Sequence, residues 1–158
     1  MNLFNPSAPR VHTRTGWFRA TVSALALFAW LLSSPAQAAP FTAADAKTVR
    51  SVVEAQLAAL AKDDAPKAFS YAAPNIRQSI GTANAFLEMV KNSYPVVYRP
   101  ASVTFLKAEG TGDEVLQRVQ MSNAAGDSFI AIYSLQRQKD KSWRIAGCLV
   151  AENKARMA

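Results

Sequence analysis

The spacing of apolar residues changes at Pro100, and this change constrains the fold more than any other feature of the sequence. Before Pro100, apolar side chains recur every three or four residues, which is the repeat of an amphipathic helix. After it, they alternate with polar side chains, which is the repeat of a β-strand. Helices first and strands second predict an α+β domain, with the helices packed on one face of an antiparallel sheet.

The helical half should begin with its longest helix. Thr42 and Asp45 have the spacing of a capping box, which predicts a helix that starts at about Ala43 and runs to about Lys62. One face of this helix is apolar and carries Val49, Val52, Val53, Leu57 and Leu60. A stripe of this width predicts that the helix packs along the sheet.

Two shorter helices, with a short turn between them, should follow the first helix. Asp64 is placed as an N-cap, with Pro66 in the first turn of a short helix, and Pro74 begins another short turn. Thr82 caps a further helix that should end before Tyr94, because that residue precedes a proline. The segment between the predicted leader and Pro100 is therefore expected to form one long helix and shorter helical segments.

The second half predicts a curved four-stranded antiparallel meander, because only short turns separate its segments. The expected strands are Ser102–Glu109, Glu114–Ser122, Ser128–Gln138 and Ser142–Ala151. Alternation predicts one face of the third strand as Phe129, Ala131, Tyr133 and Leu135. The same argument predicts one face of the fourth strand as Trp143, Ile145, Gly147 and Leu149.

Residues 1–38 have the pattern of a secretory signal peptide. Three arginines precede an apolar run from Ala20 to Leu32, and a small-x-small site ends at Ala38. The run is shorter than the roughly 20 residues of a membrane span, although an uncleaved anchor is the lesser alternative. We expect cleavage after Ala38, a secreted or periplasmic product without a stable membrane anchor, and one α+β domain over residues 39–158.

Maturation would change the chemistry open to the chain. The only histidine, His12, leaves with the leader, which excludes histidine catalysis and histidine-containing metal sites from the product. The leader also removes three of 18 basic residues and none of the 11 acidic ones, leaving a charge of +4. No dense basic cluster is present, so nucleic-acid binding is not expected, and no metal or other cofactor is expected either.

Several short motifs resemble a known family. The strings are Gln56-Leu57-Ala58-Ala59, Asp63-Asp64, Ala68-Phe69, Phe86-Leu87-Glu88-Met89-Val90, Tyr94-Pro95-Val96-Val97-Tyr98-Arg99-Pro100 and Ser142-Trp143-Arg144-Ile145-Ala146-Gly147-Cys148. Together they resemble the exported bacterial family called domain of unknown function 4864, within the nuclear-transport-factor-two-like superfamily. The resemblance covers about Val49 to Val150. It implies a cone-like α+β fold, often with a pocket between the long helix and the sheet, and it supplies no functional residues.

Five residues are candidates for contacts with a ligand: Gln56, Tyr98, Arg99, Tyr133 and Arg144. Gln56 falls inside the apolar stripe of the first helix, so its amide must bond within the protein or face a polar part of a cavity. Tyr98, Tyr133 and Arg99 could stack on and orient a ligand, or they could complete the core and a turn. Arg144 alternates with Trp143 and should share a strand face with Cys148, where a buried arginine would need an anion.

Two further features have competing interpretations. Cys148 has no partner within the mature chain and is expected to be a small buried hydrophobe or to link two chains through a disulfide. The pair Asp63-Asp64 could form coupled carboxylates, but capping by Asp64 explains it better.

Three hypotheses for function follow from these observations. The first is a non-catalytic domain that binds an unknown small molecule or a protein partner. The second is an acid–base isomerase or dehydratase with a tyrosine donor, whose carboxylate base would have to be Glu54 or Glu88. The third is a structural protein that oligomerises through its outer sheet face, as a homodimer. No catalytic residue is assigned, because the mature chain lacks histidine and no carboxylate is placed by pattern inside the core.

Overall fold

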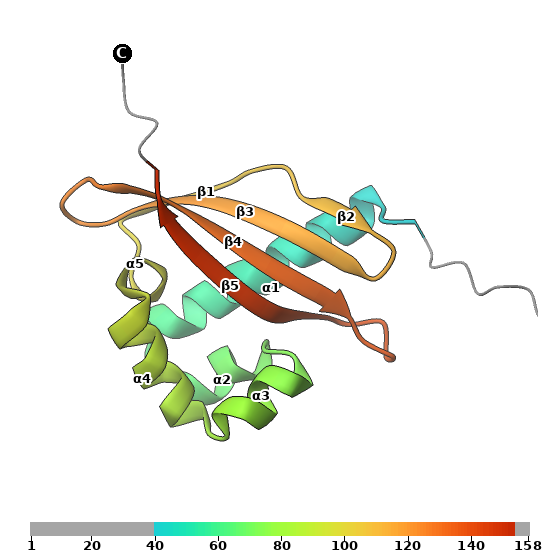
Figure 1. Ribbon diagram of the computed structural model, residues 1–158, viewed down its shortest axis with the longest axis horizontal. Helices are drawn as coiled ribbons and strands as arrows, with labels where there is room; N and C mark the ends of the chain where they lie inside the picture. The colour runs from blue at the N-terminus through green and yellow to red at the C-terminus, as the bar shows by residue number, and fades with distance from the viewer. Residues whose placement is uncertain (1–39, 154–158) are drawn as a thin grey trace, which may run out of the picture. The chain divides into compact units, whose positions relative to one another are not determined.

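The computed structural model describes residues 40–153, and Figure 1 shows that the helices of this part lie on one side of a twisted sheet. The helices are α1 (Ala43–Ala61), α2 (Ala65–Ser70), α3 (Pro74–Ile80), α4 (Ala83–Ser93) and α5 (Pro95–Tyr98). The strands are β1 (Ser102–Phe105), β2 (Glu109–Thr111), β3 (Glu114–Ser122), β4 (Ser128–Arg137) and β5 (Trp143–Glu152). This order confirms the α+β prediction. The predicted signal peptide lies outside the described residues.

The predicted helix starts are confirmed by their caps. The Thr42 hydroxyl accepts a hydrogen bond from the Asp45 amide at 3.1 Å, and the Asp45 carboxylate accepts one from the Thr42 amide at 3.0 Å. The Asp64 carboxylate accepts from the Lys67 amide at 3.0 Å, and Thr82 caps α4 in the same way. Helix α3 extends over the segment after Pro74, where only a short turn was predicted. Helix α5 was not predicted, because a four-residue helix is too short to show a periodic pattern.

The sheet has the strand order β1-β3-β4-β5, with β2 also paired to β3, and all of these pairs are antiparallel. The prediction of four strands is therefore wrong by one, because the first segment is divided into β1 and β2. Between them, the Gln117 side chain donates a hydrogen bond to the Leu106 carbonyl at 2.7 Å. This buried amide bonds to the backbone where the regular ladder is interrupted, so the segment can leave the sheet and rejoin it.

A β-bulge in β5 changes which side chains face the helices. Leu135 of β4 pairs with Ile145, but the preceding Ser134 pairs with Gly147, so Ala146 is an extra residue. Beyond the bulge, alternation is reversed: Cys148 stands beside the buried Tyr133, and Leu149 is 65% exposed. The predicted face of Trp143, Ile145, Gly147 and Leu149 is therefore correct only up to Ile145.

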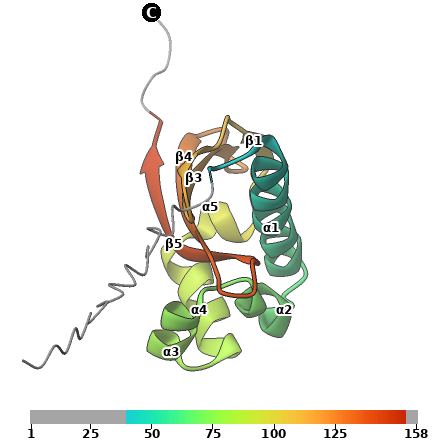
Figure 2. The same cartoon turned by 90° about the vertical axis from the view of Figure 1, so that its right-hand side faces the viewer.

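The helices and the sheet share one core. Figure 2 shows α1 along one side of the sheet, with α2, α3 and α4 gathered near one end of it. The apolar stripe of α1 is buried against the inner face of β3, β4 and β5, and its most deeply buried members are Val49, Val53 and Leu60. The sheet contributes Tyr133 and Leu135, which lie on the face of β4 that alternation predicted. Burial of these two opposed faces is the main contribution to the stability of the domain.

The start of α1 is tied to the end of the sheet through Asp45. Its carboxylate accepts a hydrogen bond from the Trp143 indole at 3.4 Å and forms an ion pair with Arg137 at 3.0 Å. The Arg137 guanidinium lies 4.6 Å from the Trp143 ring centre, which is a cation–π distance. Bonds from Thr42, together with those from Arg137 and Trp143, lower the pKa of Asp45 well below its usual range. Asp45 therefore both caps α1 and orients it on the sheet.

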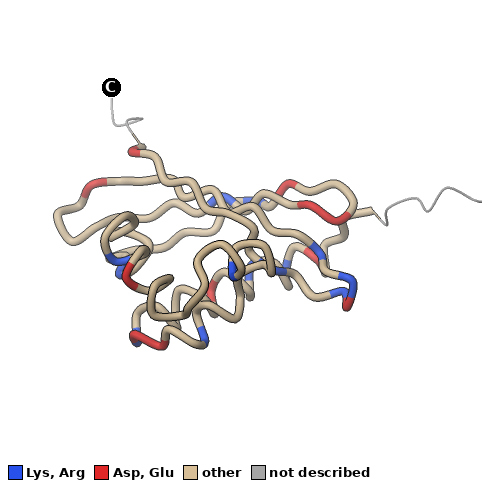
Figure 3. The backbone as a smooth tube through the Cα atoms, turned by 60° about the horizontal axis from the view of Figure 1, so that its bottom comes forward, with Lys and Arg blue, Asp and Glu red and all other residues tan. Residues whose placement is uncertain are grey.

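Charged side chains are dispersed over the domain. Figure 3 shows Lys and Arg interspersed with Asp and Glu along the described backbone. Within residues 40–153, no helix combines the length and the apolar character that a membrane crossing requires.

Candidate functional site

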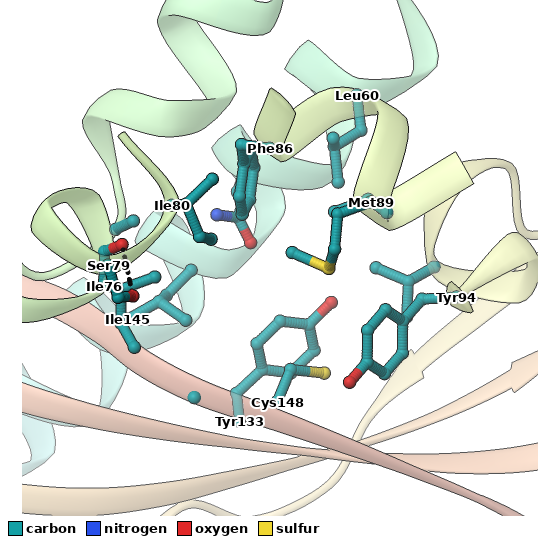
Figure 4. Close-up of a pocket in the computed structure, with 15 residues that line it drawn as sticks. Leu60, Ile76, Ser79, Ile80, Phe86, Met89, Tyr94, Tyr133, Ile145 and Cys148 are labelled. Atoms are coloured by element: carbon teal, nitrogen blue, oxygen red, sulfur yellow. Dashed lines mark hydrogen bonds between the residues drawn. The ribbon is translucent and has the colours of Figure 1, made fainter. Parts of the chain in front are cut away.

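A pocket of about 260 Å³ lies between the helices and the inner face of the sheet. Figure 4 shows Tyr133 and Cys148 on the sheet side of this pocket, facing Met89, Phe86 and Ile80 on the helical side. Tyr94, between α4 and α5, also lines the pocket. Leu60 of α1 and Ile145 of β5 complete much of its apolar wall. The pocket is where the fold leaves space between the two halves of the core, and it is the best candidate for a binding site.

The helical wall of the pocket has both buried and accessible parts. Phe86 is buried in α4, whereas Met89 on the same helix and Ile76 and Ile80 of α3 are only half-buried. Helix α3 has no fully buried side chain, and its exposed Ser79 bonds back to the Ile76 carbonyl at 3.0 Å (Figure 4). The accessible edge of the pocket is therefore formed by α3 and the facing side of α4.

Tyr133 brings an unpartnered hydroxyl to the pocket. Its side chain is 1% exposed, and the hydroxyl has no hydrogen-bond partner among the described residues. Burial raises the pKa of Tyr133 well above its usual value, and the neighbouring Cys148 thiol raises it further without reaching hydrogen-bond geometry. The hydroxyl stays protonated at neutral pH, so it is a hydrogen-bond donor. A buried donor without a protein partner is rare in folded proteins, and a water molecule or a ligand in the pocket would supply the missing acceptor.

Cys148 reaches the pocket only because of the bulge at Ala146. Its thiol is free and half-buried, and burial raises its pKa to about 12. At neutral pH the sulfur is therefore an uncharged thiol, which is a poor nucleophile. The structure supports the prediction of a small, mainly apolar cysteine within the chain. The predicted alternative of a disulfide between two chains stays a prediction.

Gln56 is buried within the apolar stripe of α1, as predicted, and it also lines the pocket. Its amide nitrogen donates to the Ala68 carbonyl of α2 at 3.2 Å. The two alternatives raised by the sequence, internal bonding and contact with a cavity, are thus combined in one side chain. Gln56 holds α2 against α1 and places an amide group at the pocket wall.

The other cationic and aromatic candidates do not reach the pocket. The Tyr98 hydroxyl donates to Asp63 at 2.5 Å, and Arg99 donates to the same carboxylate at 2.8 Å. Lys91 completes this surface group, with its ammonium 3.1 Å from Asp63. The hydrogen bond from Tyr98 and then that from Lys91 lower the pKa of Asp63. This group connects the end of α1 with α4 and α5, and it lies outside the pocket lining.

Arg144 is also outside the pocket, so the prediction that it shares a face with Cys148 is wrong. Residues 144 and 148 are an even number apart, but the extra residue at Ala146 places them on opposite faces of β5. The Arg144 guanidinium donates to the Trp143 carbonyl at 3.1 Å. It does not supply a positive charge to the pocket.

The pocket lining contains no charged side chain. Glu54, one of the two carboxylates that the enzyme hypothesis required, is exposed and paired with Arg50 at 2.8 Å. The other, Glu88, is exposed and paired with Lys91 at 3.3 Å. Neither points a base into the cavity. The polar groups of the lining are neutral and belong to Gln56, Ser79, Tyr94, Tyr133 and Cys148.

Sequence reasoning did not place Met89, Ile76 or Ile80 in a site. Each is an apolar residue of a helical segment. An apolar pattern does not distinguish a side chain that fills the core from one that borders a cavity. Tyr94 served only to mark the end of a predicted helix, and its position before Pro95 did not show which way its ring points. The one signal that could have located the pocket is Gln56, a polar residue within an apolar stripe.

Comparison with known proteins identifies the family. A family profile described as Domain of unknown function (DUF4864) matches residues 42–158. The chain belongs to this DUF4864 family. No curated protein matches the chain. A solved NTF-2-like protein of unknown function from Silicibacter pomeroyi DSS-3 is similar, with 17% identity and a TM-score of 0.48 over 68% of this chain and 94% of that one.

The profile match confirms the resemblance to the DUF4864 family that the sequence motifs showed. The matched region contains all of the pocket-lining residues, from Gln56 to Cys148. The pocket is therefore formed entirely within the DUF4864 domain.

Proposed function

We propose that this DUF4864 domain is a binding module that holds one small, mainly apolar molecule in the pocket between its helices and its sheet. The observation that supports this proposal is a cavity of about 260 Å³ whose wall is apolar except for a few neutral polar groups. Binding pockets for small molecules commonly have this composition, in which apolar walls provide affinity and a few polar groups set orientation.

Binding without catalysis fits the chemistry of the lining better than the acid–base alternative does. An isomerase or dehydratase of the kind considered needs a carboxylate within hydrogen-bond reach of its substrate. Glu54 and Glu88 are both outside the pocket and paired with cations. The Cys148 thiol, with a pKa raised by burial to about 12, is not an activated nucleophile.

The test is a ligand screen on the mature chain by thermal shift, followed by calorimetric titration. We expect small apolar molecules to raise the Tm of the unaltered chain, and the shift should grow with the logarithm of ligand concentration above the Kd. Met89→Trp should reduce this shift, because Met89 lies in the pocket and a larger ring takes up its space. Leu116→Trp is the matched control, because Leu116 is 47% exposed on β3 and outside this pocket.

Two outcomes would contradict the binding proposal. One is a screen in which no molecule of suitable size raises the Tm of the unaltered chain. The other is a set of ligands that stabilise Met89→Trp as strongly as the unaltered chain, because those ligands would bind elsewhere.

We also propose that the chain is exported and cleaved after Ala38. The support is the sequence pattern of residues 1–38 together with a family match that begins at residue 42, beyond the expected cleavage site. Mass spectrometry of the protein made in a bacterial host with its leader should give a mature N-terminus at Ala39 in the periplasmic fraction. A full-length chain retained in the cytoplasm or the membrane would contradict this proposal.

Oligomerisation through the outer sheet face is a second candidate. Its support is the exposure of Leu149, which is paired across the strands with half-buried Ile132 on the face turned away from the helices. Leu116 adds a further exposed apolar side chain to that face. This role is compatible with ligand binding, because the pocket opens on the opposite side of the sheet.

A further inference from the structure

We infer that the pocket selects an uncharged ligand that carries a hydrogen-bond acceptor, such as the carbonyl of a ketone, aldehyde or ester, and that the Tyr133 hydroxyl donates to this acceptor. This inference rests on the proposed function and specifies the chemical class of the ligand. It assigns one residue as the polar anchor and predicts that carboxylates are rejected.

The anchor follows from the state of the Tyr133 hydroxyl in the ligand-free protein. The group is almost completely buried, lines the cavity and donates to no atom of the described chain. Its loss of contact with water on folding is therefore not offset by an internal hydrogen bond. Figure 4 shows the hydroxyl directed from the sheet towards Met89 and the open part of the pocket. An acceptor placed there would supply the missing partner.

The other polar groups at the pocket are less suited to be the main anchor. The Gln56 amide nitrogen already donates to Ala68, and the Ser79 hydroxyl already donates to Ile76. A thiol such as that of Cys148 is only a weak hydrogen-bond donor. Tyr94 is half-buried, so water can reach it without a ligand. Tyr133 is thus the donor that gains most from a bound acceptor.

The preference for an uncharged ligand follows from the absence of any cation in the lining. The nearby cations are engaged elsewhere: Lys91 and Arg99 bind Asp63, and Arg144 bonds to the backbone on the other face of β5. A carboxylate in this apolar cavity would lose its hydration without gaining a counter-ion. Burial also keeps Tyr133 and Cys148 protonated, so the pocket carries no charge of either sign at neutral pH.

The volume sets the size of the ligand. A cavity of about 150 Å³ is large enough for a benzene-sized ring. By the same proportion, the 260 Å³ of this pocket accommodates a molecule of roughly ten non-hydrogen atoms. A substituted aromatic ring or a short branched chain with one carbonyl group has this size.

Three probes of nearly the same shape test the inference: acetophenone, α-methylstyrene and benzoate. They carry a carbonyl acceptor, an apolar group in its place, and a carboxylate, respectively. Each is titrated by NMR or calorimetry into the mature chain, into Tyr133→Phe and into Tyr71→Phe. Tyr71 is half-buried and outside the pocket lining, so it controls for the loss of a tyrosine hydroxyl in general.

We expect acetophenone to bind the unaltered chain roughly two- to tenfold more tightly than α-methylstyrene, as one hydrogen bond predicts. Benzoate should bind more weakly than either. Tyr133→Phe should bind acetophenone and α-methylstyrene equally, whereas Tyr71→Phe should keep the preference. The ligand-free Tyr133→Phe variant should have a Tm equal to or above that of the unaltered chain, because it lacks an unpartnered buried hydroxyl.

The contradicting outcomes separate this inference from the proposed function. If acetophenone and α-methylstyrene bind the unaltered chain equally, or if benzoate binds best, the inference is wrong while the binding proposal stands. If Tyr133→Phe keeps the preference, or if its ligand-free form is clearly less stable, Tyr133 is not the anchor. If none of the three probes binds, both the inference and the proposal of a pocket for molecules of this size fail.

Discussion

Single side chains in this domain act through contacts that join distant parts of the chain. Asp63 is the clearest example, because its backbone has a positive φ of 56° and its carboxylate receives three cationic or hydroxyl groups. Aspartate and asparagine adopt this left-handed conformation more readily than most other residues. Asp63 therefore turns the chain between α1 and α2 and, through its charge, holds α4 and α5 beside that turn.

We expect Asp63→Asn to lower the Tm at neutral pH, because asparagine keeps the turn and loses the charge that Tyr98, Lys91 and Arg99 contact. The hydrogen bonds to Asp63 lower its pKa in the folded state. A carboxyl group whose pKa is lower in the folded state stabilises the protein at pH values above its unfolded pKa of about 4. This stabilisation is lost as the pH falls through the folded pKa. The difference in Tm between the variant and the unaltered chain should therefore shrink in acid.

The control for this prediction is Asp64→Asn. Asparagine is as good an N-cap as aspartate, so this neighbouring change should leave the Tm nearly unaltered. If Asp63→Asn lowers the Tm by the same amount at pH 7 and in strong acid, the charge of Asp63 does not contribute to stability. Thermal melts over a pH series make the comparison.

At the scale of secondary-structure elements, the bulge in β5 decides what the pocket contains. Without the extra Ala146, alternation would turn Gly147 and Leu149 towards the helices and Cys148 outwards. With it, the thiol faces the pocket and Leu149 faces away from the helices, where it is exposed. One inserted residue thus sets both the lining of the pocket and the apolar character of the outer sheet face.

The orientation of Cys148 predicts slow reaction with thiol reagents. Burial raises its pKa to about 12, so at pH 8 almost none of the chains carry the reactive thiolate. We expect Ellman's reagent to modify the native chain far more slowly than the chain unfolded in guanidinium. A non-reducing gel should show little disulfide-linked dimer.

A matched variant tests whether the bulge is responsible. In Cys148→Ser, Leu149→Cys, the single thiol moves one position along β5 to a site that is 65% exposed in the unaltered chain. This thiol should react rapidly in the native state. Equal rates for the two proteins, or rapid modification of native Cys148, would contradict the arrangement of side chains beyond Ala146.

At the scale of the whole molecule, the two faces of the sheet suggest two separate roles. The inner face contributes to the pocket, and the outer face carries exposed Leu149 and Leu116 beside half-buried Ile130 and Ile132. Exposed apolar side chains that lie together often mark an interface. A second copy of this chain is the partner that the outer face would meet in a homodimer.

Sedimentation of the mature chain at micromolar concentration tests this dimer. If the outer face pairs, the unaltered chain should sediment as a dimer and Leu149→Lys as a monomer, because the charge would be buried without a partner. Lys47→Leu, on the exposed surface of α1, is a control that should not change the state of association. A monomer for the unaltered chain would exclude this interface at that concentration and leave the pocket proposal untouched.

Local patterns predicted much of the fold and little of the candidate site. The starts of α1, α2 and α4 were predicted because a capping residue lies within three positions of the amide that it binds. Gln56 was placed correctly in the buried face, since helical periodicity depends only on spacing along the chain. By contrast, the meeting of Asp63 with Tyr98 depends on how the turn after α1 and helix α5 pack together, which spacing does not show.

By itself, the amino-acid sequence determined the succession of helices and strands, the caps, the alternating face of β4 and the family. The order of elements, the caps and the face of β4 depend on interactions between residues close together in the chain, or on the apolar repeat of one element. The tertiary structure alone decided the pocket. The bulge, the division of β1 from β2 and the unpartnered Tyr133 hydroxyl arise where helices and strands distant in sequence compete for the same space and the same hydrogen bonds.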